Sequence, residues 1–406
     1  MILRAKHIID ADFRLIDNGF VRTDSSRIVE VGPSTDATDE VTVDCGDSLL
    51  MPGLVNAHTH LELGGLRNAV PPTHDFVDWL ARLVPMMRSM GNDQEDIGTA
   101  VKSGLQDSLI GGATHVADIS RFATITRESI ANIASRPRVT SFGEVLGSKS
   151  VNPDELIAQS ADCHSITADL TLGISPHSTY TVPLATMQEC VSTAARLKSI
   201  MCIHAAESVE EEEFVVNGTG PLRDFLESMG ACDSSHKPFG GRPIEFLNHA
   251  GALGSNTLLA HCNHVNDDDI NLIASNQTSV VYCPRTHHAF GHPSHRFDDM
   301  LRAGINVCLG TDSLASNPSL SMLDEIRFLR SHRPDISAET IMRMATVNGE
   351  KALCATGTVD VLSAGSQANM IAIPIDPTGA ADPFENVLAS AIQPTHCMVA
   401  GNLLIG

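Results

Sequence analysis

Eight short apolar segments, each followed by a stretch of helical character, constrain the fold of this chain more than any other feature. They lie at residues 54–60, 114–120, 138–146, 170–178, 200–207, 257–265, 279–285 and 306–312. Helical patterns separate them, for example at 76–90, 96–110, 184–197 and 243–252. Near-continuous apolar strands that alternate with helices are typical of a parallel sheet covered on both faces. Eight such units predict an α/β fold of the (β/α)8 TIM-barrel type.

A doubly wound sheet is the competing arrangement, and the residues after the first strand argue against it. Such sheets usually carry a glycine-rich phosphate-binding turn at that position. Here the chain reads NAHTHLEL, with His58 and His60 two residues apart. The barrel is therefore favoured.

The two chain ends have a different character from the middle. Short β-leaning segments occupy residues 2–9, 19–23, 27–32 and 40–45 near the start, and 369–375 and 395–405 near the end. Neither set alone has enough strands to close a core. We expect residues 1–50 and 360–406 to form one small β-sandwich domain together, with residues 51–359 as the barrel.

Net charge and cysteine content indicate the kind of partner and the location of the protein. The chain has 406 residues and a net charge of −22 at pH 7. Nucleic acids and anionic membranes bind basic surfaces, so we expect neither as a partner and a small-molecule substrate instead. No signal-peptide pattern opens the chain, and Cys202, Cys262 and Cys308 lie in apolar strands, which favours reduced thiols and a cytoplasmic location. A homodimer is compatible with the sequence.

Residues that can carry chemistry gather where the predicted strands end. In a strand, residues i and i+2 point to the same side, so His58 and His60 present two imidazoles to one point. Imidazole is a common ligand of zinc and related metals. Catalytic residues of TIM barrels lie at the carboxyl ends of the strands. Further polar or ionisable residues found there are Glu62, Glu144, His177, His204, Glu207, His261, Arg285, Asp312 and Ser313.

The order of these residues resembles the amidohydrolase superfamily over nearly the whole chain, and within it the branch of one-metal deaminases and chlorohydrolases. In that branch, the H-x-H of strand one, the histidine of strand five and the aspartate of strand eight hold the metal. The resemblance therefore implies His58, His60, His204 and Asp312 as ligands. Strand four, LTLGISPHS, lacks the lysine of two-metal members. We expect one divalent ion, zinc first and iron as the alternative.

The resemblance also implies how the reaction is divided among the catalytic residues Glu207, His261 and Asp312. A divalent metal lowers the pKa of the water it binds to about 7. Asp312 is expected to accept a proton from that water, and Glu207 to carry a proton to the ring nitrogen and to the leaving amine. His261 would orient the water or polarise the substrate. This predicts an amidohydrolase-type hydrolase of carbon–nitrogen bonds in cyclic amidines.

Several segments point to an adenosine-type substrate. SPHSTYT, which contains His177, is similar to the PHAPYT segment of adenosine-like deaminases. HTHLEL followed by Phe76 and Trp79, GTGPLRDFL, LLAHCNHV and VVYCPRTHHAFGH resemble the aminodeoxyfutalosine deaminases. Their substrate, 6-amino-6-deoxyfutalosine, is an adenosine-type nucleoside that bears a carboxyphenyl ketone.

Such a substrate implies a set of contacts. Glu62 or Glu144 would hold the ribose hydroxyls, and Trp79 would form an apolar wall unless it is a plain core residue. Arg285 is the expected partner of the carboxylate, because a guanidinium pairs with it through two hydrogen bonds; Arg121 is the second candidate. His177 and Ser313 complete the expected substrate contacts.

Other interpretations stay open at this point. A triazine chlorohydrolase of the N-ethylammeline or atrazine type, or a deaminase of guanine or cytosine, would use the same metal ligands. A barrel without catalysis that serves as a scaffold is the remote alternative, because a fold alone does not imply function. The histidines between His287 and His295 indicate either a second metal site or a loop over the pocket, the latter favoured by their irregular spacing.

Overall fold

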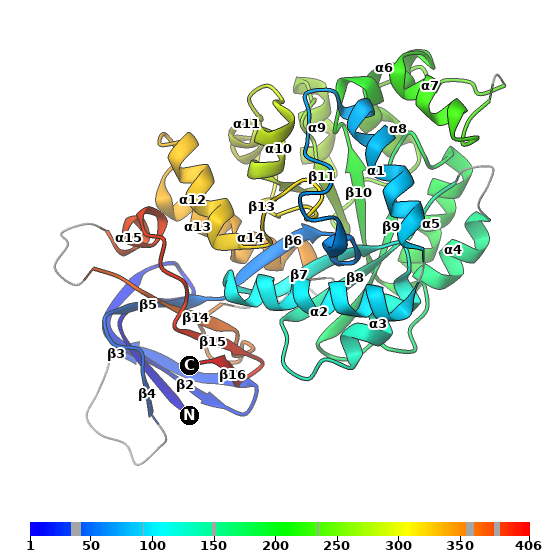
Figure 1. Ribbon diagram of the computed structural model, residues 1–406. Coiled ribbons are helices and arrows are strands. Elements are labelled where there is room, and N and C mark those ends of the chain that lie inside the picture. Colours follow the sequence, from blue (N-terminus) through cyan, green and yellow to red (C-terminus); the bar gives the residue numbers. More distant parts are fainter. Residues whose placement is uncertain (34–41, 92, 148–151, 234, 355–360, 377–381) are drawn as a thin grey trace.

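The structure is a computed structural model that describes residues 1–33, 42–91, 93–147, 152–233, 235–354, 361–376 and 382–406. Eight parallel strands form its central sheet, in the order β13-β12-β11-β10-β9-β8-β7-β6. They are β6 (Leu54–Thr59), β7 (Ala113–Ser120), β8 (Arg138–Val145), β9 (Leu170–Pro176), β10 (Ile200–Ala205), β11 (Thr257–His261), β12 (Ser279–Tyr282) and β13 (Val307–Leu309). The edge strands meet where the amides of Thr311 and Asp312 donate to the carbonyl oxygen of His58, at 3.1 and 3.0 Å. The predicted barrel fold is confirmed (Figure 1).

Helices surround this barrel in Figure 1, and their ends follow local sequence signals. The helix α1 begins after Asp75, whose side chain accepts a hydrogen bond from the amide of Asp78 at 2.8 Å, and it ends before Gly91 with φ 68°. The barrel helices are α1 (Phe76–Met90), α2 (Gln94–Ile110), α3 (Ala123–Ala131), α4 (Pro153–Ser160), α5 (Leu184–Leu197), α6 (Val209–Asn217), α7 (Pro221–Ser228), α8 (Pro243–His249), α9 (Asp267–Ser275), α10 (Pro284–Phe290), α11 (Phe297–Arg302), α12 (Met322–His332), α13 (Ala338–Met344) and α14 (Val347–Leu353), with a 3-10 turn at Leu61–Leu66. The bounds predicted for α1 and α5 agree with the structure.

Several strands end earlier than the apolar segments predicted, and for β10 and β11 the backbone conformation explains why. Left-handed φ occurs at Ala206 (49°), directly after β10, and at His261 (74°) and Cys262 (53°), at the end of β11; Asp312 (60°) lies three residues past β13. A left-handed residue turns the chain out of the pleated ladder. The polar residues that come next therefore lie on loops at the carboxyl end of the barrel, above its apolar interior.

The two chain ends build one mixed sheet, as predicted. Its order is β16-β15-β14-β5-β1-β2-β3, with β4 paired to β1. The strands are β1 (Ile2–Ile9), β2 (Leu15–Asp24), β3 (Arg27–Pro33), β4 (Thr42–Asp44), β5 (Ser48–Pro52), β14 (Met370–Pro374), β15 (His396–Val399) and β16 (Asn402–Ile405), and α15 (Pro383–Ala389) lies between β14 and β15. The start and end of the chain join where β5 pairs with β14, and both termini lie in this sheet (Figure 1).

This sheet encloses a core of its own. Leu3, Ile8 and Leu50 from the chain start are buried against Met370 and Met398 from the chain end. The sheet reaches Pro52, two residues past the boundary expected at residue 50. The other expected boundary, between 359 and 360, and residues 40–41 of the expected strand 40–45 lie outside the described residues.

Two further expectations concern the environment of the chain. Cys202, Cys262 and Cys308 are buried and carry free thiols. None of the helices in the described part of the chain is both long enough and apolar enough to cross a bilayer.

Candidate functional site

Four predicted metal ligands converge at the carboxyl end of the barrel. The ligand nitrogens of His58, His60 and His204 all lie within 4.8 Å of one another, with 3.4 Å between the Nε2 atoms of His60 and His204. Asp312 Oδ1 lies 3.8 Å from His58 Nε2 and 3.7 Å from His60 Nε2. His58 Nε2 is buried without a hydrogen-bond partner, an arrangement that costs free energy unless an ion binds the nitrogen. Three imidazoles and one carboxylate fit a divalent transition metal.

The charge state of these imidazoles suits metal binding. Burial, and then the neighbouring imidazoles, lower the pKa of His58 and His60 well below the ordinary value. Burial lowers the pKa of His204 to about 4. Neutral imidazole is the form that binds metal. The Nδ1 of His204 donates to the carbonyl oxygen of His177 at 2.9 Å, which leaves its Nε2 free to face the other ligands.

The three residues expected to handle protons lie beside these ligands. Glu207 Oε1 lies 3.5 Å from His261 Nε2. Burial raises the pKa of Glu207 well above its ordinary value, and the nearby Asp312 raises it further, so the carboxyl can donate a proton. Burial also raises the pKa of Asp312, to about 6. We call His58, His60, His204, Glu207, His261 and Asp312 the catalytic end.

Hydrogen bonds fix the orientation of the catalytic end. Ser316 Oγ donates to Asp312 Oδ2 at 2.7 Å, and the amide of Ser313 donates to Asp312 Oδ1 at 2.7 Å. His295 Nε2 donates to the carbonyl oxygen of His261 at 2.8 Å. Because His261 and Asp312 both adopt left-handed φ, these contacts hold a backbone conformation that is unfavourable by itself.

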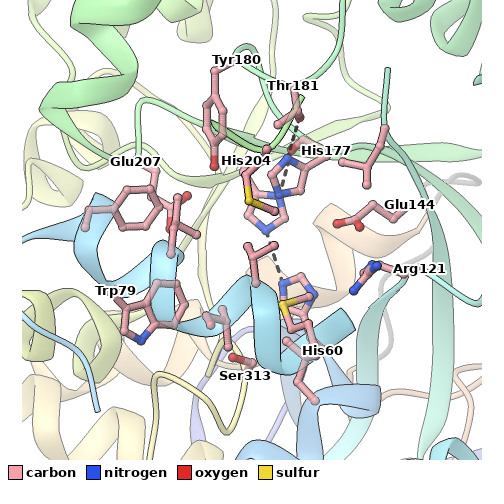
Figure 2. Close-up of a pocket in the computed structure, with 18 of the residues that line it drawn as sticks. His60, Trp79, Arg121, Glu144, His177, Tyr180, Thr181, His204, Glu207 and Ser313 are labelled. Atoms are coloured by element: carbon pink, nitrogen blue, oxygen red, sulfur yellow. Dashed lines mark hydrogen bonds between the residues drawn. The ribbon is translucent and has the colours of Figure 1, made fainter. Parts of the chain in front are cut away.

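A polar wall of the same pocket contains the expected ribose and substrate contacts. Glu62 accepts from Ser120 Oγ at 2.9 Å and from the amide of Arg121 at 3.2 Å, and burial raises its pKa to about 7. Burial raises the pKa of Glu144 as well, while the charge of Arg121 lowers it. Among the described residues, neither the guanidinium of Arg121 nor the carboxylate of Glu144 has an ion-pair partner within 4.0 Å. Figure 2 shows both on one side of His60 and His204.

Apolar side chains of two helices complete the pocket. We call this the apolar wall: Phe76, Trp79, Leu83 and Met87 of α1 with Phe225 and Leu226 of α7. Trp79 is buried, packs on Phe76, and donates from Nε1 to the carbonyl oxygen of Val70 at 2.9 Å. It is thus both a packed residue and a lining residue, and it faces the pocket across from Glu144 (Figure 2).

Of the remaining expected substrate contacts, two lie in the pocket and one lies outside it. His177 and Ser313 line the pocket, and His177 Nδ1 lies 2.7 Å from Thr181 Oγ1. Arg285 does not line it, which corrects the expected placement. The strand β12 ends at Tyr282, and Arg285 lies in the first turn of α10, where its Nη1 donates to Ser319 Oγ at 2.8 Å and lies 3.6 Å from Asp324 Oδ2.

Two ionisable lining residues were not identified from the sequence. Tyr180 follows His177 by three residues in SPHSTYT, and burial raises its pKa well above the ordinary value. Arg88 is exposed at the pocket edge. It follows Leu80 and Val84 at helical spacing, so the periodicity of α1 could have placed it on the pocket face.

Comparison with known proteins finds relatives in sequence and in fold. The 5-methylthioadenosine/S-adenosylhomocysteine deaminase of Acetivibrio thermocellus is 28% identical over 370 residues, which cover 86% of this chain and 79% of that protein. The aminofutalosine deaminase of Helicobacter pylori, solved with methylthio-coformycin, has a TM-score of 0.85 and 21% identity and covers 100% of both chains. A variant of atrazine chlorohydrolase from Arthrobacter aurescens, solved with zinc and atraton, has a TM-score of 0.85 at 20% identity and covers 100% of this chain and 95% of that one.

These two solved structures share the fold of this chain, and their sequence identities are too low to show a shared activity. The model of the amidohydrolase family matches residues 49–404, which include the whole barrel and most of the strands from the chain end. The chain therefore belongs to the amidohydrolase family and is an amidohydrolase-type hydrolase of carbon–nitrogen bonds.

Proposed function

We propose that this protein is a metal-dependent hydrolytic deaminase of an adenosine-type nucleoside similar to 6-amino-6-deoxyfutalosine. The observation that carries the proposal is the convergence of Glu207 and His261 on a cluster of metal-ligand residues at one end of a mostly apolar pocket. The names of two of the three reported proteins agree with it, since 5-methylthioadenosine, S-adenosylhomocysteine and aminofutalosine all contain a 6-aminopurine ring.

His58, His60, His204 and Asp312 would hold one divalent ion, zinc first and iron as the alternative. When bound, such an ion acts as a Lewis acid and lowers the pKa of a coordinated water to about 7. The orphaned Nε2 of His58 supports this ligand set, because nothing else in the described part of the chain satisfies that buried nitrogen.

The protein groups then divide the proton transfers. Asp312 accepts one proton of the attacking water, and Glu207 donates its proton to the ring nitrogen beside the amino-bearing carbon. The hydroxyl proton of the resulting tetrahedral intermediate passes through Glu207 to the amino group, which leaves as ammonia. The proton held by Asp312 then restores Glu207, so both groups return to their starting forms. His261, 3.5 Å from Glu207, orients the attacking oxygen.

Substrate recognition is assigned to the two walls. Glu62 and Glu144 accept hydrogen bonds from the ribose hydroxyls, His177 and Ser313 contact the ring, and the apolar wall takes an apolar group on the 5′ carbon. With Arg285 outside the pocket, Arg121 becomes the proposed partner of a substrate carboxylate. Its charge already acts on Glu62, Glu144 and His177, so it lies within electrostatic reach of the polar wall.

The test is product release by zinc-loaded enzyme from a panel of substrates, measured as ammonia from the amino-bearing compounds and as chloride from atrazine. Adenosine, 5′-methylthioadenosine and aminodeoxyfutalosine represent the proposal, while guanine, cytosine and atrazine represent the alternatives. We expect turnover of at least one 6-aminopurine nucleoside and little turnover of the others. Good turnover of guanine, cytosine or a triazine without any 6-aminopurine nucleoside would replace the proposal with the corresponding alternative.

A further inference from the structure

A second group of histidines lies near the catalytic end and has no task in the proposed reaction. We call His264, His287 and His292 the second histidine cluster; they lie on the segments that follow β11 and β12. A fourth member of the region, His295, is already used, since it donates to the carbonyl oxygen of His261 and stacks on Tyr282 with ring centroids 4.1 Å apart. The other three need a separate explanation.

One nitrogen pair and two ring distances in this cluster resemble those of the first metal-ligand set. His264 Nε2 lies 3.2 Å from His292 Nδ1, compared with 3.4 Å between the Nε2 atoms of His60 and His204. Two nitrogens bound to one tetrahedral zinc at ~2.0–2.1 Å would lie about 3.3 Å apart. The ring centroids of His264 and His287 lie 5.1 and 5.4 Å from that of His292, within the range of 5.0 to 5.4 Å found among His58, His60 and His204.

His287 supplies an independent sign that something binds there. It is only 8% exposed, and its Nε2 has no hydrogen-bond partner. The ring instead bonds to the backbone of Pro293, so its Nδ1 is the engaged nitrogen. Metal-binding imidazoles usually have this arrangement, in which one ring nitrogen bonds a backbone group and the other is free to bind the ion.

The charge state of the cluster is also suitable. Burial first, and then neighbouring imidazoles, lower the pKa of His287 and of His292 to about 3. Burial lowers the pKa of His264 as well. The rings are therefore neutral near pH 7 and have a lone pair available for an ion.

We propose that His264, His287 and His292 form a second metal site, which takes a divalent transition metal such as zinc. The site is weaker than the first, because His58, His60 and His204 form the sole described trio with its ligand atoms within 4.8 Å of one another. The nitrogen of His287, the third of the second histidine cluster, reaches an ion held by His264 and His292 only after a ring rotates. His264 and His292 are half-buried, so an ion can enter from solvent, and water completes the ligand set.

Binding at this site would connect two segments that touch the catalytic end. His264 follows His261 by three residues, and His292 precedes His295 by three. An ion shared by His264 and His292 would therefore reinforce the contact that His295 makes with the backbone of His261. The proposal depends on the fold and these side chains alone, so it holds whichever substrate the enzyme uses.

The test is the number of zinc ions bound per chain. Chelator-treated full-length protein is dialysed against buffered free zinc from the nanomolar to the micromolar range and analysed for metal. We expect two equivalents in the unaltered protein, a tight one and a weak one. His292→Ala and His264→Gln should lose the weak equivalent and keep the tight one, whereas His204→Ala should lose the tight one.

A matched control is available on α10, the helix that carries His287. His288 is exposed and packs against Phe328 and His332 instead of joining the cluster, so His288→Ala should keep both equivalents. Melting temperatures in chelator verify that each variant is folded. A single equivalent in the unaltered protein overturns the proposal without any variant. A weak equivalent that survives in both His292→Ala and His264→Gln also overturns it, and would show that the 3.2 Å contact is only a hydrogen bond between two imidazoles.

Discussion

The catalytic end and the apolar wall share one pocket but are built in different ways. The catalytic end consists of residues on or just after barrel strands, where parallel hydrogen bonding and left-handed turns fix each position. The apolar wall comes from α1 and α7, two helices outside the strands of the barrel that contact each other (Figure 1). The difference suggests that one region performs the chemistry and the other selects the substrate. Changes at the catalytic end should then act on kcat, and changes in the wall on KM.

Removal of a metal ligand should have the largest effect. In His204→Ala the tight metal equivalent is lost, and deamination should fall by about 10⁴-fold or more, because the pKa of free water is ~15.7 instead of about 7. Metal analysis and ammonia release measure both effects. Added zinc should restore chelator-treated unaltered enzyme but not the variant. Activity near that of unaltered enzyme without bound metal would contradict the account.

The second-largest effect on activity is expected when the proton carrier, Glu207, is changed. Glu207→Gln keeps the size and shape of the side chain but cannot exchange a proton, so kcat should fall ~10²–10⁴-fold. Zinc content and melting temperature should stay close to those of the unaltered protein, since Glu207 is not among the proposed ligands. A loss of only a few-fold would mean that another group moves the proton.

Arg121 and Arg285 form a matched pair for the carboxylate contact. A charge-paired hydrogen bond contributes ~1.5–3 kcal/mol, so Arg121→Met should raise KM for an acidic nucleoside about 10–150-fold. Plain adenosine should respond far less. Arg285→Met should leave both KM values unchanged and lower only the melting temperature, because Arg285 contacts Ser319 and Asp324. The opposite result would return the role to Arg285.

The smallest effect is expected in the apolar wall. Met87→Ala removes part of the surface that covers a 5′ group, so KM should rise by about 5–30-fold, equivalent to about 1–2 kcal/mol, with kcat nearly unchanged. Met86 is the control, since it is 37% exposed and does not line the pocket. Steady-state kinetics with 5′-methylthioadenosine measures the change. An equal effect of Met86→Ala would show that the loss is not local.

The same comparison explains how much the sequence alone could predict. Strands buried on both faces form continuous apolar runs, so the barrel could be identified, and the i, i+2 spacing aligned His58 with His60. Where the strands end was harder to predict, because a short apolar run does not show a left-handed turn. The misplacement of Arg285 has another cause, since the apolar run does not show that β12 ends at Tyr282 or that α10 begins at Pro284 and carries Arg285 toward Asp324.

For the apolar wall, the sequence predicted the helix but not which of its faces lines the pocket. The helical pattern of α1 was visible, but which face meets the pocket depends on how the helix packs on its neighbours. Trp79 could therefore be read as core or as wall, and it is both. Tyr180 was missed because only His177 was singled out in SPHSTYT, and Arg88 was missed because it belongs to no motif; the assembled pocket brings both together with His204.

The most direct test of the central claim is a substrate series on the unaltered zinc-loaded enzyme. It compares kcat/KM for adenine, adenosine and an adenosine with an apolar 5′ substituent. If the catalytic end performs the deamination and the two walls hold the ribose and the 5′ group, kcat/KM should rise at each step, by at least about tenfold overall. Equal values for all three, or a preference for free adenine, would show that the walls do not hold a nucleoside.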